Sequence, residues 1–195
     1  MTLLKKVKAV QKVYEELDAE IEKFKTTSVL KCKEGCGECC KKADIEATPI
    51  EFLPLAYYLY HQGKALDFWE KIKKTEDPFC ALFNPFLSNF GGLCTEYPYR
   101  GLICRLFGFS ATKDKDGHAK LITCKLIKSE QAEVYQQALE TIKSGGNIPV
   151  MSDFYMKLYA IDFNLSGKFY PINQAMRMAL ETVMNYYSYR TKRTG

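Results

Sequence analysis

Hydrophobic residues near the N-terminus recur at alternating steps of four and three. Over residues 3–24 these positions are Leu3, Val7, Val10, Tyr14, Leu17, Ile21 and Phe24. This heptad seam extends over three repeats and predicts a long amphipathic helix. One interpretation is that the seam lies on the protein's own core. The alternative is a coiled-coil contact, and therefore self-association or a protein partner bound through this helix.

Further helices are predicted along the rest of the chain. The stretch TPIE offers Thr48 as a cap and Glu51 as the second half of a capping box, and predicts a helix that ends before Gly63. Pro54 lies inside this pattern and should bend the helix or delay its start. The other predicted helices are 64–76, 129–146 with Ser129 as its cap, 150–162 and 172–189.

The middle of the chain has a different character. Residues 79–109 are rich in Gly, Pro and aromatic residues and show no sustained period, so we expect an irregular segment that a bound metal holds in place. Two short apolar runs around the turn KDKDG predict a β-hairpin over 105–127, with Cys124 in its second strand. The predicted fold is mainly α: a single helical domain over 1–195, with an irregular cysteine-rich metal-binding segment and a small β-hairpin.

Composition and charge narrow the class of protein. The 195 residues are 47% hydrophobic and 26% charged, which is enough for one domain with a core. The net charge of +5 is mild and most lysines are interleaved with acidic residues, so we expect no nucleic-acid binding. No apolar run approaches the roughly 18 residues of a membrane helix, and the N-terminus does not resemble a signal peptide. These features predict a cytoplasmic protein without a membrane segment.

Eight cysteines carry the candidate chemistry, and half of them fall between residues 32 and 40. In a reducing cytosol such a cluster is typical of metal binding or catalysis rather than of disulfides. Thiolates suit zinc, copper(I) and iron–sulfur clusters; an all-cysteine site needs four of them, so eight allow two centres. One centre plus several buried core cysteines is the alternative. The candidate metal ligands are Cys32, Cys36, Cys39, Cys40, Cys80, Cys94, Cys104 and Cys124.

The N-terminal cysteine pattern, C-x3-C-x2-C-C, ends in an adjacent pair, Cys39 and Cys40. Neighbouring side chains in an extended backbone point to opposite sides, so the pair suits two centres better than one. Cys36 and Cys39 have the x2 spacing shared by zinc and iron–sulfur sites. The two histidines, His61 and His118, lie at a predicted helix end and a turn, which argues against a His-rich zinc site. Thioredoxin-like exchange through CGEC is a rival interpretation, but it needs a βαβ context.

A second motif, CTEYPYRGLICR, places Tyr97, Arg100 and Arg105 beside two cysteines. Arginines there can offset the charge of a thiolate site or bind an anionic substrate in a bidentate fashion. The simpler alternative is a salt bridge that stabilises an irregular loop. Tyr97, Arg100 and Arg105 are therefore the candidate substrate-binding residues.

Together these motifs resemble a known family. The stretch CKEGCGECC, followed by CALF, GLCTEYPYRGLICRLFGF and a late cysteine, is similar to the CxxCxxCC, or YkgJ-like, zinc- or iron-chelating domains of bacteria. The resemblance covers residues 32–124, a cysteine-rich metal-chelating core flanked by N- and C-terminal helices. Two departures are the three-residue gap between Cys32 and Cys36, where the family commonly has two, and Gly101, where the family usually has proline, a change that loosens the loop.

The resemblance implies metal binding through the eight cysteines. It extends to the cysteine-rich region of flagellin lysine N-methylase, which is associated with an iron–sulfur cluster, and so suggests enzymatic, protein-modifying chemistry. The leading hypothesis is one or two iron–sulfur centres of the [4Fe-4S] type, because a purely structural zinc ion would not require the adjacent pair or the arginines. The alternative is a structural zinc-binding interaction module, in which the metal ties 79–109 to the N-terminal loop and the terminal helices bind a partner.

Overall fold

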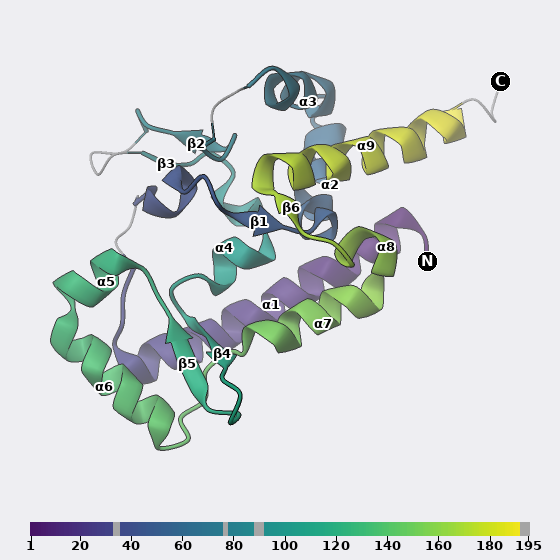
Figure 1. Cartoon of the computed structure of the whole chain (residues 1–195). Helices are drawn as coiled ribbons and strands as arrows, with labels where there is room; N and C mark the ends of the chain where they lie inside the picture. Colours follow the sequence, from purple (N-terminus) through teal and green to yellow (C-terminus); the bar gives the residue numbers. More distant parts are fainter. Residues whose placement is uncertain (33–35, 76–77, 88–91, 192–195) are drawn as a thin grey trace.

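Helices form most of the described structure, and the strands are short and paired in twos (Figure 1). The structure is a computed structural model that describes residues 1–32, 36–75, 78–87 and 92–191. The α-helices are α1 (Leu3–Ser28), α2 (Leu53–His61), α3 (Ala65–Lys74), α4 (Leu102–Leu106), α5 (Lys125–Glu130), α6 (Ala132–Lys143), α7 (Met151–Ile161), α8 (Phe163–Ser166) and α9 (Ile172–Thr191). The shorter elements are the 3-10 helices η1 (Glu38–Lys41), η2 (Pro49–Phe52) and η3 (Tyr97–Tyr99) and the strands β1 (Glu46–Ala47), β2 (Phe83–Asn84), β3 (Leu93–Cys94), β4 (Ser110–Lys113), β5 (Ala119–Ile122) and β6 (Tyr170–Pro171). The fold is mainly α and forms a single domain, as the sequence predicts.

Helix α1 runs along the molecule and packs against α2, α4, α6 and α7 (Figure 1). Every residue of the heptad seam is at most 4% exposed, so the seam lies on the protein's own core. This confirms the first interpretation of the pattern. Self-association or a protein partner bound through this helix stays a prediction, and it would have to use the exposed face of α1 rather than the buried seam.

The capping box at the start of the second helical region forms as predicted. The Glu51 carboxylate accepts hydrogen bonds from the backbone N–H of Thr48 at 2.7 Å and from the Thr48 hydroxyl at 3.1 Å. The first turn is the 3-10 helix η2, and α2 begins only at Leu53, so Pro54 lies in the first turn of α2 and delays its start. The chain leaves α2 through Gly63, whose φ of 71° suits glycine.

The C-terminal half contains the short helix α8 and the strand β6, which were not predicted, and one predicted helix differs in its bounds. Residues 129–146 were expected to form a single helix capped by Ser129, but α5 begins at Lys125 and Ser129 lies inside it. The helix breaks at Gln131, whose side chain accepts a hydrogen bond from Lys31 N at 3.0 Å and donates one to Lys31 O at 2.7 Å. Because the helix breaks at this residue, the side-chain amide of Gln131 reaches the backbone of the segment that follows α1.

The predicted hairpin is present as β4 and β5, in a register that pairs Ser110 with Ile122 and Lys113 with Ala119. Cys124, expected in its second strand, lies beyond the strand as the cap of α5. The other two sheets pair β2 with β3 and β1 with β6, all antiparallel. The segment 79–109 is irregular over most of its described residues, but it includes β2, β3 and the short helix α4, which the sequence pattern did not predict.

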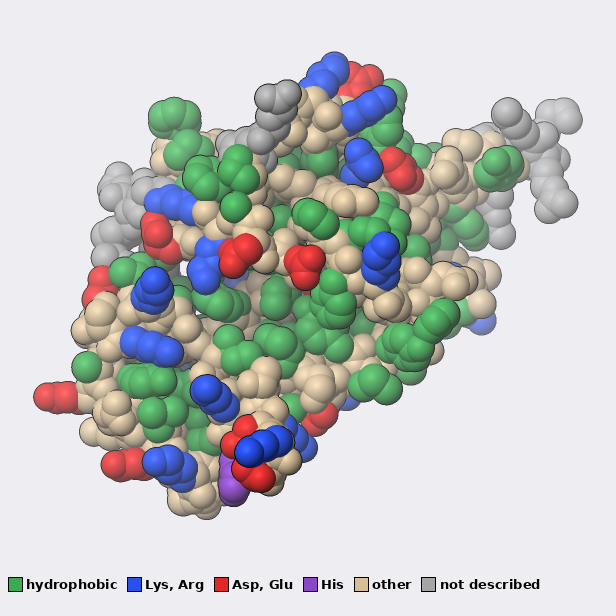
Figure 2. Space-filling model, viewed as in Figure 1, with side chains coloured by type: hydrophobic (Ala, Val, Ile, Leu, Met, Phe, Trp, Pro, Cys, Tyr) green, Lys and Arg blue, Asp and Glu red, His purple; other side chains and the backbone are tan. Residues whose placement is uncertain are grey.

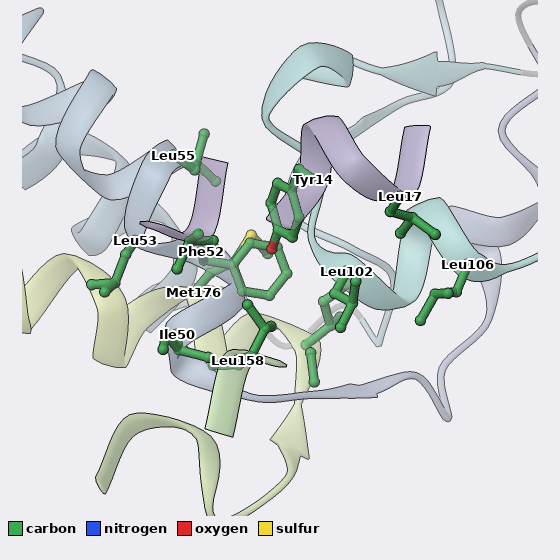
Figure 3. Close-up of a cluster of buried hydrophobic side chains, with 14 of the residues drawn as sticks. Tyr14, Leu17, Ile50, Phe52, Leu53, Leu55, Leu102, Leu106, Leu158 and Met176 are labelled. Atoms are coloured by element: carbon green, nitrogen blue, oxygen red, sulfur yellow. The ribbon is translucent and has the colours of Figure 1, made fainter. Parts of the chain in front are cut away.

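Figure 3 shows the hydrophobic cluster at the centre of the domain. Side chains from α1, η2, α2, α4, α7 and α9 meet there, with Phe52, Leu102 and Leu158 at most 1% exposed. Full burial of one such side chain contributes about 1.5–3 kcal/mol to stability. The cluster fixes η2 and α4 relative to α1. Among the described residues, no helix combines the length and the apolar character needed to cross a membrane.

Glu51 joins this core to α4. Its carboxylate accepts a third hydrogen bond, at 2.9 Å, from the backbone N–H of Ile103, and the Tyr14 hydroxyl donates to the Glu51 carbonyl at 2.7 Å. Burial raises the pKa of the Glu51 carboxyl to about 7, against the opposing effect of these N–H donors. The folded chain therefore holds this proton more tightly than the unfolded chain.

This difference in pKa predicts a stability that depends on pH. A carboxyl whose pKa is raised on folding stabilises the fold at low pH, and the free energy of unfolding falls as the pH rises from about 4.5 to about 7. The Glu51→Gln variant lacks this titration, so it should gain up to about 3 kcal/mol on the wild type between pH 4.5 and 8. Chemical denaturation at a series of pH values measures the difference. Glu15→Gln, on the exposed side of α1, is the control, and parallel profiles for wild type and Glu51→Gln would contradict the prediction.

Candidate metal centre

The eight cysteines come from distant parts of the chain and converge on one region. Cys32 follows α1, Cys36 lies in the loop before η1, and Cys39 and Cys40 are within η1. Cys80 precedes β2, and Cys94 ends β3. Cys104 lies inside α4, and Cys124 is the N-cap of α5. All eight are free thiols.

One set of four thiols, the peripheral group, consists of Cys32, Cys36, Cys39 and Cys124. The pKa of Cys32 is raised by burial and then by the neighbouring thiols of Cys36 and Cys124. The pKa of Cys39 is raised to about 12 by burial and then chiefly by Cys32 and Cys124. These four side chains therefore lie within electrostatic range of one another.

The other set, the inner group, consists of Cys40, Cys80, Cys94 and Cys104. The pKa of Cys40 is raised to about 12, first by a thiol hydrogen bond with Cys80, and a second thiol hydrogen bond joins Cys40 to Cys94. The pKa of Cys104 is raised by burial, with Glu51, Cys40 and Cys94 adding to the effect. Cys80 is the most deeply buried of the eight, at 6% exposure.

The adjacent pair is divided between the two groups. Cys39 and Cys40 occupy one turn of η1, in which Cys40 N donates to Gly37 O at 2.8 Å. Cys40 O in turn accepts from Cys80 N at 3.0 Å, which fixes η1 against the start of the segment 79–109. The thiol of Cys36 also raises the pKa of Cys40, so the two groups adjoin at η1, and two separate centres stay a prediction.

A cavity of about 990 Å³ lies between the two groups, and seven of the eight cysteines line it, all but Cys124. Its apolar wall includes Phe107, Phe109 and Ile45. Lysine ammonium groups lie over two of these rings, Lys25 at 4.9 Å from the centroid of Phe109 and Lys42 at 5.2 Å from that of Phe107. On the face shown in Figure 2, basic side chains are interspersed with acidic ones.

Raised pKa values indicate what these thiols can do. A thiol that exchanges disulfides needs a lowered pKa, because the thiolate is the nucleophile. The raised pKa in the CGEC stretch belongs to its second cysteine, Cys39, and the described elements on either side of η1 form no βαβ unit. Bound cations reverse the effect of burial and stabilise thiolates, so the donor set fits soft metal centres and opposes the thioredoxin-like interpretation.

Backbone N–H groups already point at one sulfur of each group. Cys124 Sγ accepts from Ile127 N at 3.4 Å in the peripheral group. Cys94 Sγ accepts from Glu96 N in the inner group. Such N–H donors stabilise thiolate ligands and tune the reduction potential of iron–sulfur centres.

Arg105 is held by contacts within the protein. Its Nε–H donates to Arg100 O at 3.2 Å, one terminal nitrogen donates to Pro98 O at 2.6 Å, and the other pairs with the Asp18 carboxylate on α1. Its guanidinium also lies over the ring of Tyr14, at 4.6 Å from the centroid. With a 9% exposed side chain, Arg105 fixes the loop that precedes α4.

Arg100 lines the cavity and stacks over the ring of Tyr97, at 4.1 Å from the centroid. Tyr97 is 55% exposed, at the edge of the cavity. Both arginines line the cavity, but the guanidinium of Arg105 is held by Asp18 and two backbone carbonyls, whereas the Nε of Arg100 has no hydrogen-bond partner among the described residues. A role in substrate binding remains a prediction for all three residues of this motif.

Close packing at Gly37 brings the cysteine loop onto the β2–β3 pair. A Cβ atom on Gly37 would lie 2.5 Å from both Gly92 O and the ring of Phe83. The residue has an ordinary φ of −95°, so the requirement for glycine is steric rather than conformational. The other glycine predicted to shape this loop, Gly35, lies outside the described residues.

Several residues of the site were not predicted. Asp18 and Glu51 hold α4, while Lys25 and Lys42 line the cavity. The capping box pointed to Glu51, but only as a helix cap. Contacts between residues this far apart leave no local signal in a single sequence.

Alanine at Gly37 provides a test of this packing. The added Cβ should push η1 away from β3 and separate Cys40 from Cys94, so Gly37→Ala should lower the metal bound per chain, measured by elemental analysis. Gly63→Ala is the control, because Gly63 has open space around it but a positive φ. That variant should lose about 1 kcal/mol of stability and keep its metal. Equal metal content in Gly37→Ala and wild type would contradict the proposed role of this contact.

Comparison with protein families bears directly on this site. The family model CxxCxxCC, described as a putative zinc- or iron-chelating domain, matches residues 31–138, more than half of the chain. Neither a curated protein nor a solved structure matches the chain significantly. The relation to flagellin lysine N-methylase is not among these findings and stays a prediction. The matched residues include all eight thiols, and the chain belongs to the CxxCxxCC family of zinc- or iron-chelating domains.

Proposed function

We propose that the chain binds two iron–sulfur centres, one on the peripheral group and one on the inner group, and uses them in redox or enzymatic chemistry. When bound, such centres supply one-electron transfer. The chain's own residues provide two sets of four thiols, N–H donors to the sulfurs and a lined cavity between the sets. Arg100, Arg105 and Tyr97 are proposed to shape the site for its substrate, with Arg105 acting through the position of Arg100.

The observation that carries this proposal is the cavity between the thiols. A structural zinc site is closed, because the ion and four ligands fill the space they enclose. A volume of about 990 Å³ is instead typical of pockets that hold a small molecule or cofactor. The space therefore favours large centres, a substrate beside them, or both.

The spacing of the thiols does not separate the two metals. Sulfurs around one tetrahedral zinc ion lie about 3.8 Å apart, given Zn–S bonds of about 2.3 Å. The thiol hydrogen bonds of Cys40 with Cys80 and with Cys94 place two inner pairs at short range, which also suits a single ion.

The charge of the lining is also suitable. Five cations and two carboxylates line the cavity, and one of the cations, Arg105, is already paired with Asp18 outside the lining, which leaves a net charge of +2 before any thiolate is counted. Four thiolates and a metal load of 2+ leave about −2 on each centre. The wall would therefore offset part of the charge of two centres, which lowers the cost of burying that charge.

A structural zinc module is the second candidate function. The observation in its favour is the bridging of distant segments, because the inner group joins η1 to residues 80–104. Zinc there would contribute to folding, and chelation would unfold the chain. A structural zinc module would, however, give no role to the volume of the cavity.

Anaerobic purification with iron, sulfide and zinc analysis tests the proposal. Two centres predict about eight iron and eight sulfide per chain, with a broad visible absorption band. Cys39→Ser and Cys40→Ser should each remove about half of the iron, because the two residues belong to different groups.

The adjacent variants serve as matched controls for each other, since they differ by one position in the same turn. Loss of all iron in either single variant would reduce the proposal to one shared centre. A colourless protein with zinc and no sulfide would replace it with the structural module.

A further inference from the structure

Apolar side chains form much of the wall of the cavity between the thiol groups. Phe52 of η2 and Ile172 of α9 line the cavity, and the packing of the core holds both of them in place. Leu82 and Phe109 are also buried and line the cavity beside β2 and β4. A molecule that covers such surfaces gains free energy roughly in proportion to the apolar area that it removes from water. The wall therefore fits an occupant with an apolar body.

The charges of the lining are largely balanced within the protein. Besides Arg105, a second lining cation is paired outside the lining, because Lys25 lies 2.7 Å from the Glu22 carboxylate. Three cations and two carboxylates then keep no ion-pair partner among the described residues, a balance of +1; they are Lys31, Lys42, Arg100, Asp44 and Glu46. Two bound centres of about −2 each would make the cavity negative and repel an anion. The charges therefore favour an uncharged occupant.

One lining side chain keeps a hydrogen-bond donor that the protein does not satisfy. The Nε atom of Arg100 is buried and has no hydrogen-bond partner among the described residues. Buried N–H groups in folded proteins nearly always have a partner, so an acceptor from outside the chain is expected here. Because Arg100 lines the cavity, a molecule bound in the cavity can provide that acceptor.

The position of Arg100 is fixed before any molecule binds. Its backbone N–H donates to Tyr97 O at 3.4 Å, and its carbonyl accepts from the Nε–H of Arg105 at 3.2 Å. Its guanidinium stacks over the ring of Tyr97, at 4.1 Å from the centroid. An arginine held in this way loses little further conformational entropy when it binds an acceptor. Arg100 is therefore a preorganised donor in an otherwise largely apolar wall.

We propose that the cavity binds an uncharged, mainly apolar carbonyl compound, and that Arg100 donates a hydrogen bond to its carbonyl oxygen. This inference rests on the proposed function, in which the compound is the substrate beside the metal centres. The apolar wall holds the body of the molecule, and the charge balance disfavours a carboxylate of the same size. The guanidinium selects the carbonyl group, because a hydrogen bond from a charged donor is roughly twice as strong as one from a neutral donor.

The test is equilibrium dialysis of the metal-loaded, full-length chain against probes that share a naphthalene ring system. The ketone 2-acetonaphthone is uncharged and has a carbonyl oxygen, 2-ethylnaphthalene has a similar shape without an acceptor, and 2-naphthoate has a negative charge. We expect a single site for 2-acetonaphthone, with an affinity about tenfold or more above that for either of the other probes. Equal or tighter binding of 2-naphthoate would overturn the proposal, because the cavity would then select anions. Absence of ketone binding to the folded, metal-loaded chain would overturn it as well.

Substitution of Arg100 separates its role from that of the wall. Arg100→Met removes the donor and the charge, so it should lower the affinity for 2-acetonaphthone about tenfold and leave the affinity for 2-ethylnaphthalene unchanged. Arg177→Met is the matched control, because Arg177 also has a buried Nε without a hydrogen-bond partner among the described residues but lies outside the cavity lining. No loss in Arg100→Met, or an equal loss in the two variants, would overturn the assignment of Arg100.

A substitution in the wall tests the location of the site. Ile45 lines the cavity and is only partly buried, so Ile45→Trp fills part of the space without replacing a residue of the buried core. This variant should weaken the binding of 2-acetonaphthone and 2-ethylnaphthalene alike, with circular dichroism and metal content as in the wild type. If a folded Ile45→Trp protein binds both probes as the wild type does, the compound does not occupy this cavity.

The proposed function and this inference fail differently. Iron, sulfide and zinc are measured on the same sample that is used for dialysis. Selective binding of the ketone to a chain that contains zinc and no sulfide would support the binding site and remove the iron–sulfur proposal. A chain that contains iron and sulfide but does not distinguish the ketone from the hydrocarbon would overturn the inference and leave the iron–sulfur proposal in place.

Discussion

Two buried polar side chains, Glu51 and Arg105, hold the short helix α4 in place, and the inner thiol group depends on the position of this helix. Glu51 accepts the N–H of Ile103, and Arg105 ties the preceding loop to Asp18 on α1. A helix of five residues has too few internal hydrogen bonds to be stable alone. Removing the Asp18 carboxylate would leave the mostly buried guanidinium of Arg105 without its ion-pair partner. Residues outside α4 therefore fix the position of Cys104.

Local patterns in the sequence were sufficient for much of the fold. The heptad seam, the capping box at Thr48 and the hairpin turn each involve residues a few positions apart, so the signal lies within a short window. The break between α5 and α6 could not be predicted from a short window of the sequence. Gln131 leaves the helix to bind Lys31, exactly one hundred positions earlier in the chain, and this contact overrides a continuous helical pattern.

For the site, the sequence indicated the candidate ligands but not their grouping. The adjacent pair suggested two centres, yet only the three-dimensional arrangement associates Cys124 with Cys32 and Cys104 with Cys40. The two arginines of one motif look equivalent in the sequence. They differ because α1 provides Asp18 beside Arg105, whereas the Nε of Arg100 faces no acceptor among the described residues.

The single peptide bond between Cys39 and Cys40 limits how such a site can change over evolutionary time. An insertion between these two residues would rotate one thiol away from its group, whereas the loops that separate the other ligands can lengthen at a small entropic cost. Length variation among related chains should therefore concentrate between the ligand-bearing segments and spare the turn of η1. A search for distant relatives would do better to require an uninterrupted Cys-Cys pair than any fixed distance to the later cysteines.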